Sequence, residues 1–191
     1  LDYSAELGGN YEIVEWLGLL AGLRKGEMAG LRYENVFIDK GMSEIHVEEA
    51  RLPMPKGVVS KSPKSTAGRR VIQIPAILAD MLRRKRREYE KNRLKAGSSF
   101  VDSGYVLSNA QGAPLYPDTI YRTHQRFMRM LQEKYPKMKI DYVKLHGLRH
   151  CYASAALETG MSAKSLMSQL GHASLEMVNL YSHSYEKSKK E

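Results

Sequence analysis

Arg24 is the first of several residues whose chemistry suits a phosphate group. It lies in the segment AGLRKGE at residues 21–27, between two stretches that the sequence predicts as helices. A guanidinium at such a break can hold a phosphate through two parallel hydrogen bonds, and N–H groups of the adjoining helix add to the attraction. The competing interpretation is a surface arginine that pairs with Glu27, and a motif this short does not decide between the two.

Lys64 occupies the second such segment, PKST at residues 63–66, which precedes RVIQIP at residues 70–75. A lysine on a flexible turn before a strand can reach a phosphate whose ester bond is breaking. With an ordinary pKa of about 10.4, it would stay charged and give up its proton only as an alkoxide develops. A generic basic hairpin tip is the alternative interpretation of the same residues.

His146 and Arg149 belong to the third pattern, HGLRH at residues 146–150. Positions three apart share one face of a helix, so both side chains can point at one small anion. The arginine supplies charge, and the histidine supplies a hydrogen bond or a proton acceptor. A helix start that carries a buried histidine is the alternative.

His172 and Tyr181 belong to the fourth pattern, LGHASLEMVNLYSH at residues 170–183. Nine residues along one straight helix would put these two side chains on opposite faces. They converge only if the chain turns between them, and the break at residues 171–174 allows such a turn. The alternative for Tyr181 is a core tyrosine packed beside Val178.

The net charge of +9 indicates a polyanionic partner, and double-stranded DNA is the commonest one. Residues 1–50 hold four Lys/Arg and ten Asp/Glu, so the positive excess lies entirely in the rest of the chain. Six basic residues and no acid occur in residues 50–70, where we favour a phosphate contact. Eight basic residues and two glutamates crowd residues 83–95, and there we favour a solvated helix face.

Composition bounds the class of protein. The 191 residues suffice for one domain with its own core, and 42% of them are hydrophobic. The single cysteine, Cys151, excludes a disulfide framework and favours a reducing compartment, which we expect to be the cytoplasm. We find no signal peptide, no apolar run long enough to span a bilayer and no spacing typical of a metal site. Because the chain starts at Leu1, we expect a fragment.

The elements that must carry these residues are mostly helices. Periodicity and capping residues predict helices at residues 11–21, 25–31, 75–95, 117–134, 145–158, 162–170 and 174–182. Strands are predicted at residues 36–38, 44–47 and 70–74, and residues 53–68 are predicted to be a loop or loose ribbon. Helix C-caps are expected at Gly160 and Gly171, and N-caps at Ser162 and Ser174. The expected class is α+β, mostly helical, with a small antiparallel three-stranded sheet.

Taken in order, the four patterns resemble the catalytic set of the tyrosine recombinase (phage integrase) family. The matching segments are GLRKGE, PKSTAGRRVIQIP, HGLRH and LGHASLEMVNLYSH, and the resemblance spans residues 12–183. It implies the DNA breaking-rejoining fold of a catalytic domain over residues 1–191. It also implies six catalytic residues, namely Arg24, Lys64, His146, Arg149, His172 and Tyr181. Tyr185 is a rival nucleophile, but only Tyr181 has the family's spacing from His172.

The chemistry that this resemblance implies is transesterification without metal or cofactor. The nucleophilic tyrosine would attack a DNA phosphodiester, form a 3′-phosphotyrosine and free a 5′-hydroxyl. Arg24, Arg149 and His172 would hold the non-bridging oxygens. His146 would assist removal of the tyrosine proton, and Lys64 would protonate the leaving oxygen. The expected activity is site-specific recombination, for integration or excision of a mobile element.

The resemblance also implies domains and partners beyond this chain. Family members normally carry an N-terminal core-binding domain and often an arm-binding domain, and we expect both to be absent from this fragment. Full-length relatives assemble as homotetramers on paired DNA sites, with accessory DNA-bending proteins as further partners. Two other functions stay open, a type IB-like topoisomerase that uses a similar residue set and a basic DNA-binding module without catalysis.

Overall fold

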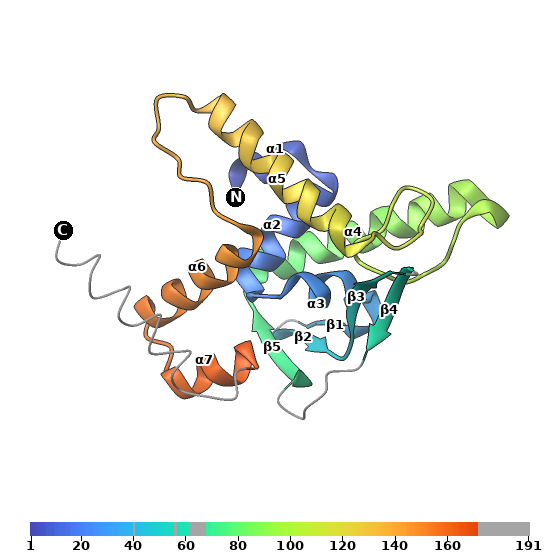
Figure 1. Cartoon of the computed structure of the whole chain (residues 1–191). Coiled ribbons are helices and arrows are strands. Elements are labelled where there is room, and N and C mark those ends of the chain that lie inside the picture. The colour runs from blue at the N-terminus through green and yellow to red at the C-terminus, as the bar shows by residue number, and fades with distance from the viewer. Residues whose placement is uncertain (40, 56, 62–67, 172–191) are drawn as a thin grey trace.

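The computed structural model describes residues 1–39, 41–55, 57–61 and 68–171, and these form seven α-helices and two small antiparallel sheets (Figure 1). The helices are α1 Asp2–Leu7, α2 Gly9–Ala21, α3 Lys25–Gly30, α4 Ala76–Ala96, α5 Pro117–Lys134, α6 Leu145–Glu158 and α7 Ala163–Leu170. The strands are β1 Val36–Ile38, β2 Ser43–Val47, β3 Ala50–Met54, β4 Gly57–Lys61 and β5 Arg70–Ile74. Two 3₁₀ turns, η1 Tyr33–Asn35 and η3 Gly97–Ser99, complete the described elements. The predicted α+β class is confirmed.

The three-stranded sheet has the order β1-β2-β5, with both pairs antiparallel. Ile45 lies opposite Val36 on one side and opposite Ile72 on the other. Alternate residues of β2 and β5 are buried, so one face of the sheet packs on the core while the other faces solvent. The three strands predicted from the sequence are therefore confirmed, with bounds that differ by one residue at most.

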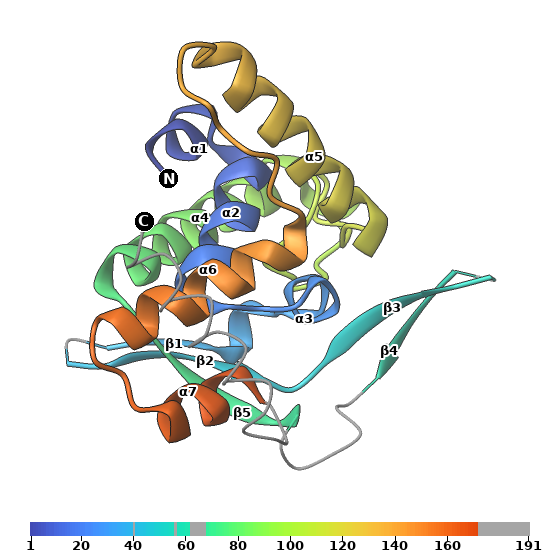
Figure 2. The ribbon, with the colours of Figure 1, turned by 60° about the vertical axis from the view of Figure 1, so that its left-hand side comes forward.

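The hairpin of β3 and β4 forms a separate two-stranded sheet that projects away from the rest of the molecule (Figure 2). Of the loop or loose ribbon predicted at residues 53–68, the ribbon is present at residues 53–55 and 57–61, where Pro53 and Val58 pair across this hairpin, but its first strand already begins at Ala50. Both faces of the hairpin are largely exposed. Without a buried face the residues show no alternation of apolar and polar types, which is the signal that predicts a strand.

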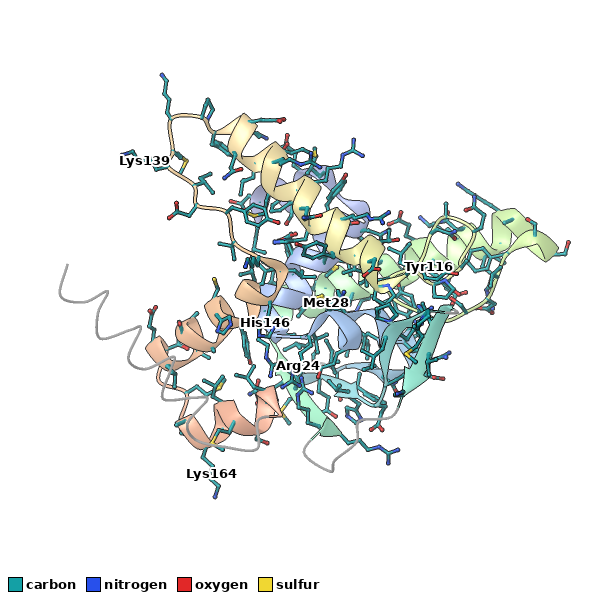
Figure 3. All side chains as sticks on the ribbon, in the orientation of Figure 1. Arg24, Met28, Tyr116, Lys139, His146 and Lys164 are labelled. Carbon is teal, nitrogen blue, oxygen red and sulfur yellow. The ribbon has the colours of Figure 1, made fainter. Side chains whose placement is uncertain are left out.

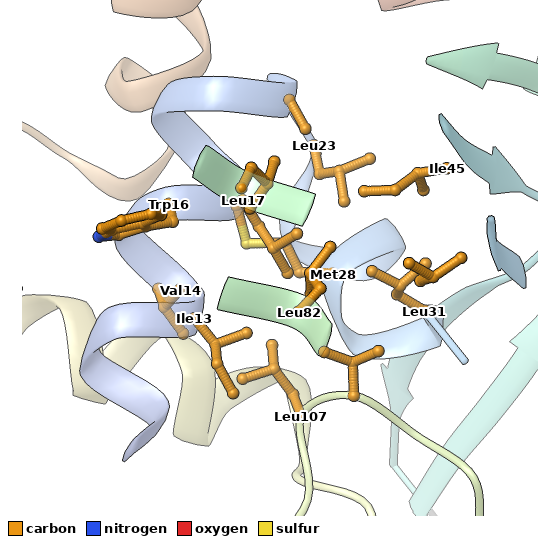
Figure 4. Packing of buried hydrophobic residues seen from close by; sticks show 14 of the residues in the cluster. Ile13, Val14, Trp16, Leu17, Leu23, Met28, Leu31, Ile45, Leu82 and Leu107 are labelled. Atoms are coloured by element: carbon orange, nitrogen blue, oxygen red, sulfur yellow. The ribbon is translucent and has the colours of Figure 1, made fainter. Parts of the chain in front are cut away.

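Helix α2 lies at the centre of the main core, with side chains of α3, α4 and the sheet packed around it (Figure 4). Ile13, Val14 and Leu17 are buried, and the helix is also buried on other sides, where Glu12, Glu15 and Trp16 lie. Glu12 is fully buried and accepts hydrogen bonds from both terminal nitrogens of Arg84, at 2.7 and 3.2 Å. A buried charge needs such a partner, so α2 requires charged residues on the helices around it.

Helix α4 carries the basic stretch at residues 83–95, and most of its cations are exposed as predicted. Lys85 and Tyr89 are the buried exceptions among the residues of that stretch. The Nζ of Lys85 lies 3.4 Å from a carboxylate oxygen of Glu12, and the Tyr89 hydroxyl donates to Asp102.

In the part of the chain that the structure describes, no helix combines the length and the apolar character needed to cross a membrane.

Helices α6 and α7 share a small core of their own, which is distinct from the main one. Its fully enclosed members include Ala153, Leu166 and Leu170. The predicted caps of α7 are confirmed, because Ser162 accepts a hydrogen bond from the backbone N–H of Ser165 at 3.1 Å and Gly171 is left-handed at φ 62°. The C-cap predicted at Gly160 is one residue too late, because Thr159 is the C-cap of α6, and Gly160 follows it with a positive φ of 91°. The predicted helix at 174–182 and the cap at Ser174 lie outside the described residues.

A buried histidine on α5 fixes the place where the chain enters α6. His124 is fully buried, and its Nδ1 lies 2.9 Å from a carboxylate oxygen of Glu15 on α2. Its Nε2 lies 2.8 Å from the carbonyl oxygen of Val143, two residues before α6 begins. Both ring nitrogens thus face acceptors, an arrangement that suits the doubly protonated ring. The contact ties the start of α6 to α2 and α5.

The pKa shifts of this pair give the stability of the fold a pH dependence. Burial alone would lower the pKa of His124, but the hydrogen bond and the charge of Glu15 raise it above the ordinary value of 6.5. Burial raises the pKa of Glu15, against the opposing effect of His124. A histidine with a raised pKa stabilises the fold below its unfolded value, and that stabilisation is lost as the pH rises through the folded pKa.

We therefore expect the free energy of unfolding of the wild-type chain to fall as the pH rises from 6.5 to about 8.5. The fall should be smaller in the Glu15→Gln variant, because His124 there lacks the carboxylate partner that raises its pKa. Chemical denaturation at several pH values measures this slope. Glu44→Gln is the matched control, because its partner His46 lies 2.7 Å away in a half-exposed pair. An unchanged slope in Glu15→Gln would contradict the assignment of the pH dependence to His124.

Candidate active site

Arg24 lies in the three-residue break between α2 and α3. Gly22 ends α2 in the left-handed conformation, at φ 60°, and the chain then turns into α3 at Arg24. A Cβ at Gly22 would lie 2.5 Å from the ring of Tyr152, so the position demands glycine for space as well as for conformation. The tight turn thereby brings Arg24 next to α6.

Glu27 holds Arg24 from the first turn of α3. The side chain of Arg24 donates to one carboxylate oxygen at 3.0 Å, and its backbone N–H donates to the other at 2.8 Å. The pairing that the sequence offered as an alternative to phosphate binding is therefore present. The Arg24 side chain still keeps 39% of its surface exposed, which leaves it open to solvent. The backbone N–H of Arg24 itself is engaged by Glu27, and α3 has only six residues, so the helix adds little to an anion site here.

His146 and Arg149 lie in the first turns of α6, but they differ sharply in exposure. His146 is exposed, and its ring meets the ring of His150 edge-on at 5.0 Å. Arg149 is 1% exposed, and its guanidinium donates to the carbonyl oxygens of Gly22, at 2.6 Å, and of Leu170. Arg149 thus joins the end of α2 to the end of α7 instead of standing beside His146 at the surface.

Three neighbouring basic groups nevertheless act on His146 at this place. Although His146 is exposed as a residue, protein atoms shield part of its ring from water, and this partial burial lowers its pKa. The neighbouring charges of His150, Arg149 and Arg24 lower it further. Figure 3 shows His146 and Arg24 near the centre of the molecule, where α3, α6 and β5 come together. The result is an imidazole that is neutral at neutral pH, beside two guanidinium groups that favour a negatively charged ligand.

Arg70, at the start of β5, is a buried partner of this site that the sequence did not single out. Its terminal nitrogens donate to both oxygens of Glu27, each at 2.9 Å, and its Nε donates to the carbonyl oxygen of Gln169 at 2.5 Å. The expectation that residues 50–70 contact phosphate was wrong for Arg70 and for Arg51. Arg51 is also buried, and it donates to the carbonyl oxygen of Leu115 and lies over the Tyr105 ring.

Lys64, His172 and Tyr181 lie outside the described residues. Two described residues that lie a few positions from Lys64 and His172 in the chain meet at one side chain, because Arg70 donates to the carbonyl oxygens of Gly68, at 3.4 Å, and of Gln169. Gly68 follows Lys64 by four residues, and Gln169 precedes His172 by three. The predicted set of six residues is thus described for Arg24, His146 and Arg149, and it stays a prediction for the other three.

Comparison with known proteins supplies the context for this arrangement. The model of the phage integrase family matches residues 10–188, which is nearly the whole chain. The chain belongs to the phage integrase family. Arg24, His146 and Arg149 all lie within the matched range, as do Lys64, His172 and Tyr181.

Curated relatives align with most of the length of this phage integrase family member. A tyrosine recombinase XerC-like protein of Caldanaerobacter subterraneus subsp. tengcongensis is 27% identical over 88% of the chain. The integrase of Mycobacterium phage L5 is 25% identical over 93% of the chain. The chain covers only 44% of each of these relatives, so it spans less than half of their length.

Solved structures agree in fold. The Tn1549 transposon integrase, in complex with circular intermediate DNA, aligns with 90% of this family member and 54% of its own chain, at a TM-score of 0.71 and 20% identity. The XerA recombinase aligns with 95% of it and 56% of its own chain, at a TM-score of 0.65 and 23% identity. At these identities the likeness establishes the fold and nothing finer.

The electrostatics of His146 can be tested directly. In the His150→Gln variant, the pKa of His146 should rise toward the ordinary value, because one neighbouring positive group is removed. An NMR titration of the ring C–H signals measures the pKa. Lys139→Gln, an exposed cation on the connector before α6, is the control and should leave the titration unchanged. A pKa of His146 that stays the same in His150→Gln would contradict the proximity of the two rings.

Proposed function

We propose that this chain is the catalytic domain of a tyrosine-type site-specific DNA recombinase, which cuts and rejoins DNA for the integration or excision of a mobile element. The observation that carries the proposal is the meeting of Arg24, Arg149 and a neutral His146 within the range matched by the phage integrase family model. The names of the relatives, tyrosine recombinase and integrase, support the same reaction.

The first step is the binding of a phosphodiester beside the two arginines. Arg24 has the exposed guanidinium and would donate to the non-bridging oxygens of the phosphate. Arg149 donates to the carbonyl oxygens of Gly22 and Leu170 and is buried. Its positive charge still acts on the region around His146, where the phosphate would bind. Fixed positive charge of this kind stabilises the additional negative charge of the pentavalent phosphorane.

The second step is attack by the hydroxyl of Tyr181. A free tyrosine has a pKa of about 10, so its hydroxyl needs a proton acceptor at neutral pH. His146 would accept this proton, because its lowered pKa keeps the ring neutral. The tyrosine oxygen then bonds to phosphorus as the bond from phosphorus to the 5′ oxygen breaks, and His172 would hydrogen-bond the phosphate.

The third step is protonation of the leaving 5′ oxygen, for which Lys64 is the proposed donor. The product is a 3′-phosphotyrosine and a free 5′-hydroxyl. Because the phosphoester bond to the tyrosine replaces the phosphodiester bond, a second 5′-hydroxyl can reverse the step without an external source of energy. This exchange of strands is what makes recombination conservative.

The partners follow from the same reaction. Double-stranded DNA is the proposed substrate, and the basic charge of the chain beyond residue 50 favours it. Since the chain covers 44% of its curated relatives, we propose that it works with N-terminal core-binding and arm-binding domains that this sequence does not include. The assembled form would be a homotetramer on paired DNA sites in the cytoplasm, aided by DNA-bending proteins.

The proposed nucleophile can be identified with a nicked suicide DNA substrate, in which loss of the short fragment that carries the freed 5′-hydroxyl traps the covalent intermediate. Wild-type protein should form an adduct that survives denaturing electrophoresis. Tyr181→Phe should form none, because it lacks the attacking oxygen. Tyr185→Phe is the matched control, four residues away, and should react at the wild-type rate.

Adduct formation by Tyr181→Phe would show that another residue is the nucleophile. Wild-type protein that binds the DNA but forms no adduct would point to a non-catalytic DNA-binding module. A type IB-like topoisomerase would form the adduct but would relax a supercoiled plasmid with no requirement for a second DNA site. Recombination between two sites by the full-length protein separates the recombinase from that alternative.

A further inference from the structure

Arg70 is a buried charge at the junction of the elements that carry the site. Its side chain is 4% exposed and makes a two-pronged contact with Glu27, with both N···O distances at 2.9 Å. Its third donor, Nε, is directed at the carbonyl oxygen of Gln169 near the end of α7. A planar guanidinium is the side chain best suited to hold a carboxylate and a carbonyl at fixed angles.

The same carboxylate holds Arg24, so two arginines share one negative charge. Burial would raise the pKa of Glu27, but the hydrogen bonds and charge of Arg70, with a smaller contribution from Arg24, lower it. The carboxylate is therefore ionised, and the three side chains carry a net charge of one positive unit. Because the side chain of Arg70 is enclosed and that of Arg24 is 39% exposed, the excess positive charge can reach a ligand through the guanidinium of Arg24.

The Gln169 contact connects this network to the chain that follows α7. The last carbonyls of a helix lack partners within the helix, and they attract positive charge. Arg70 binds the carbonyl of Gln169, and Arg149 binds the next one, of Leu170. The hydroxyl of Tyr152 reinforces this end of α7 by donating to the side chain of Gln169 at 2.5 Å.

We propose that Arg70 is a positioning residue for the recombinase reaction. It neutralises Glu27, so that Arg24 can offer its charge to the DNA phosphate. It also holds the end of α7, from which the chain continues to His172 and Tyr181. This inference rests on the proposed function. Arg70 itself is enclosed by protein and acts through Glu27 and Gln169.

Charge counting separates this role from simple packing. In Arg70→Gln, Arg24 and Glu27 form a neutral pair, and the network of these side chains loses its positive excess, while the charge of Arg149 remains. Arg70→Lys keeps the charge but loses the two-pronged geometry. The double variant Arg70→Gln/Glu27→Gln restores one positive unit on Arg24, and it also avoids the unpaired buried carboxylate that would destabilise the single variant. Arg69→Gln, at the exposed neighbouring position that pairs with Glu48, is the matched control.

The first measurement is the rate of adduct formation on the nicked suicide substrate at saturating DNA. Arg70→Gln should react about 10- to 100-fold more slowly than wild type, which is the range seen when groups that orient metal ligands are removed. Arg70→Lys and the double variant should each recover part of this loss. Arg69→Gln should react at the wild-type rate.

The second measurement replaces the scissile phosphate with a methylphosphonate, which carries no negative charge. If Arg70 acts by making charge available, its absence matters less when the ligand is uncharged, so the defect of Arg70→Gln should shrink. A packing defect would slow both substrates equally. In addition, the pKa of His146, measured by NMR without DNA, should rise in Arg70→Gln and fall back in the double variant, since Arg24 is one of the charges that lower it.

Two failures are distinguishable. Wild-type protein that binds nicked DNA without forming an adduct overturns the proposed function, and the role of Arg70 in that reaction falls with it. Arg70→Gln that reacts like wild type, or that is equally slow on phosphate and methylphosphonate with an unchanged pKa of His146, overturns the proposal for Arg70 alone. If Arg70→Gln does not fold, the test uses Arg70→Lys and the double variant instead. The charge argument predicts that the double variant forms the adduct at a partly recovered rate, so a folded double variant that forms no adduct contradicts it.

Discussion

The contact between Arg70 and Glu27 is a buried ion pair between two residues that lie 43 positions apart in the chain. It fastens the first residue of β5 to the first turn of α3, and through Arg24 it reaches the end of α2. Two charges taken out of water interact strongly, but much of the gain is lost to desolvation, so the net stabilisation of such a pair is small. Removing one partner still costs about 3–5 kcal/mol, because the other stays buried without its counter-charge. The pair therefore defines the arrangement more than it adds to stability.

The same principle recurs around α2. Glu12 and Glu15 are almost fully enclosed, and each meets a basic side chain from another helix, Arg84 on α4 and His124 on α5. A polar group that must find one particular partner in a low-dielectric interior admits fewer arrangements than an apolar group of the same size. Helices α4 and α5 are thus aligned on α2 by specific charged pairs. Helix α6, which carries His146 and Arg149, packs on α2 through apolar contacts such as Leu148 against Gly18.

The sequence predicts most of the elements because their periodicity reflects one buried face, as in β2, β5 and α5. It fails where burial does not follow that rule. The β3–β4 hairpin lacks a buried face, and α1 has only six residues. Buried arginines are the harder case, since Arg70 and Arg149 look like surface cations in the sequence. Their partners include backbone carbonyls of Gln169 and Leu170, which no residue type reveals.

The division of the hydrophobic residues into two clusters has a consequence for hydrogen exchange. The amides of α2 lie within the main core, so their exchange should require unfolding of the whole domain. The side chains of α7 pack in the small cluster shared with α6, and its last carbonyls are held by Arg70 and Arg149. Among the described residues, opening of α7 breaks these contacts and the hydrogen bond from Tyr152 to Gln169. Its amides should therefore exchange through a smaller, separate fluctuation. Such an opening of α7 would leave intact the main core, whose members Leu23 and Leu145 adjoin Arg24 and His146 in the chain.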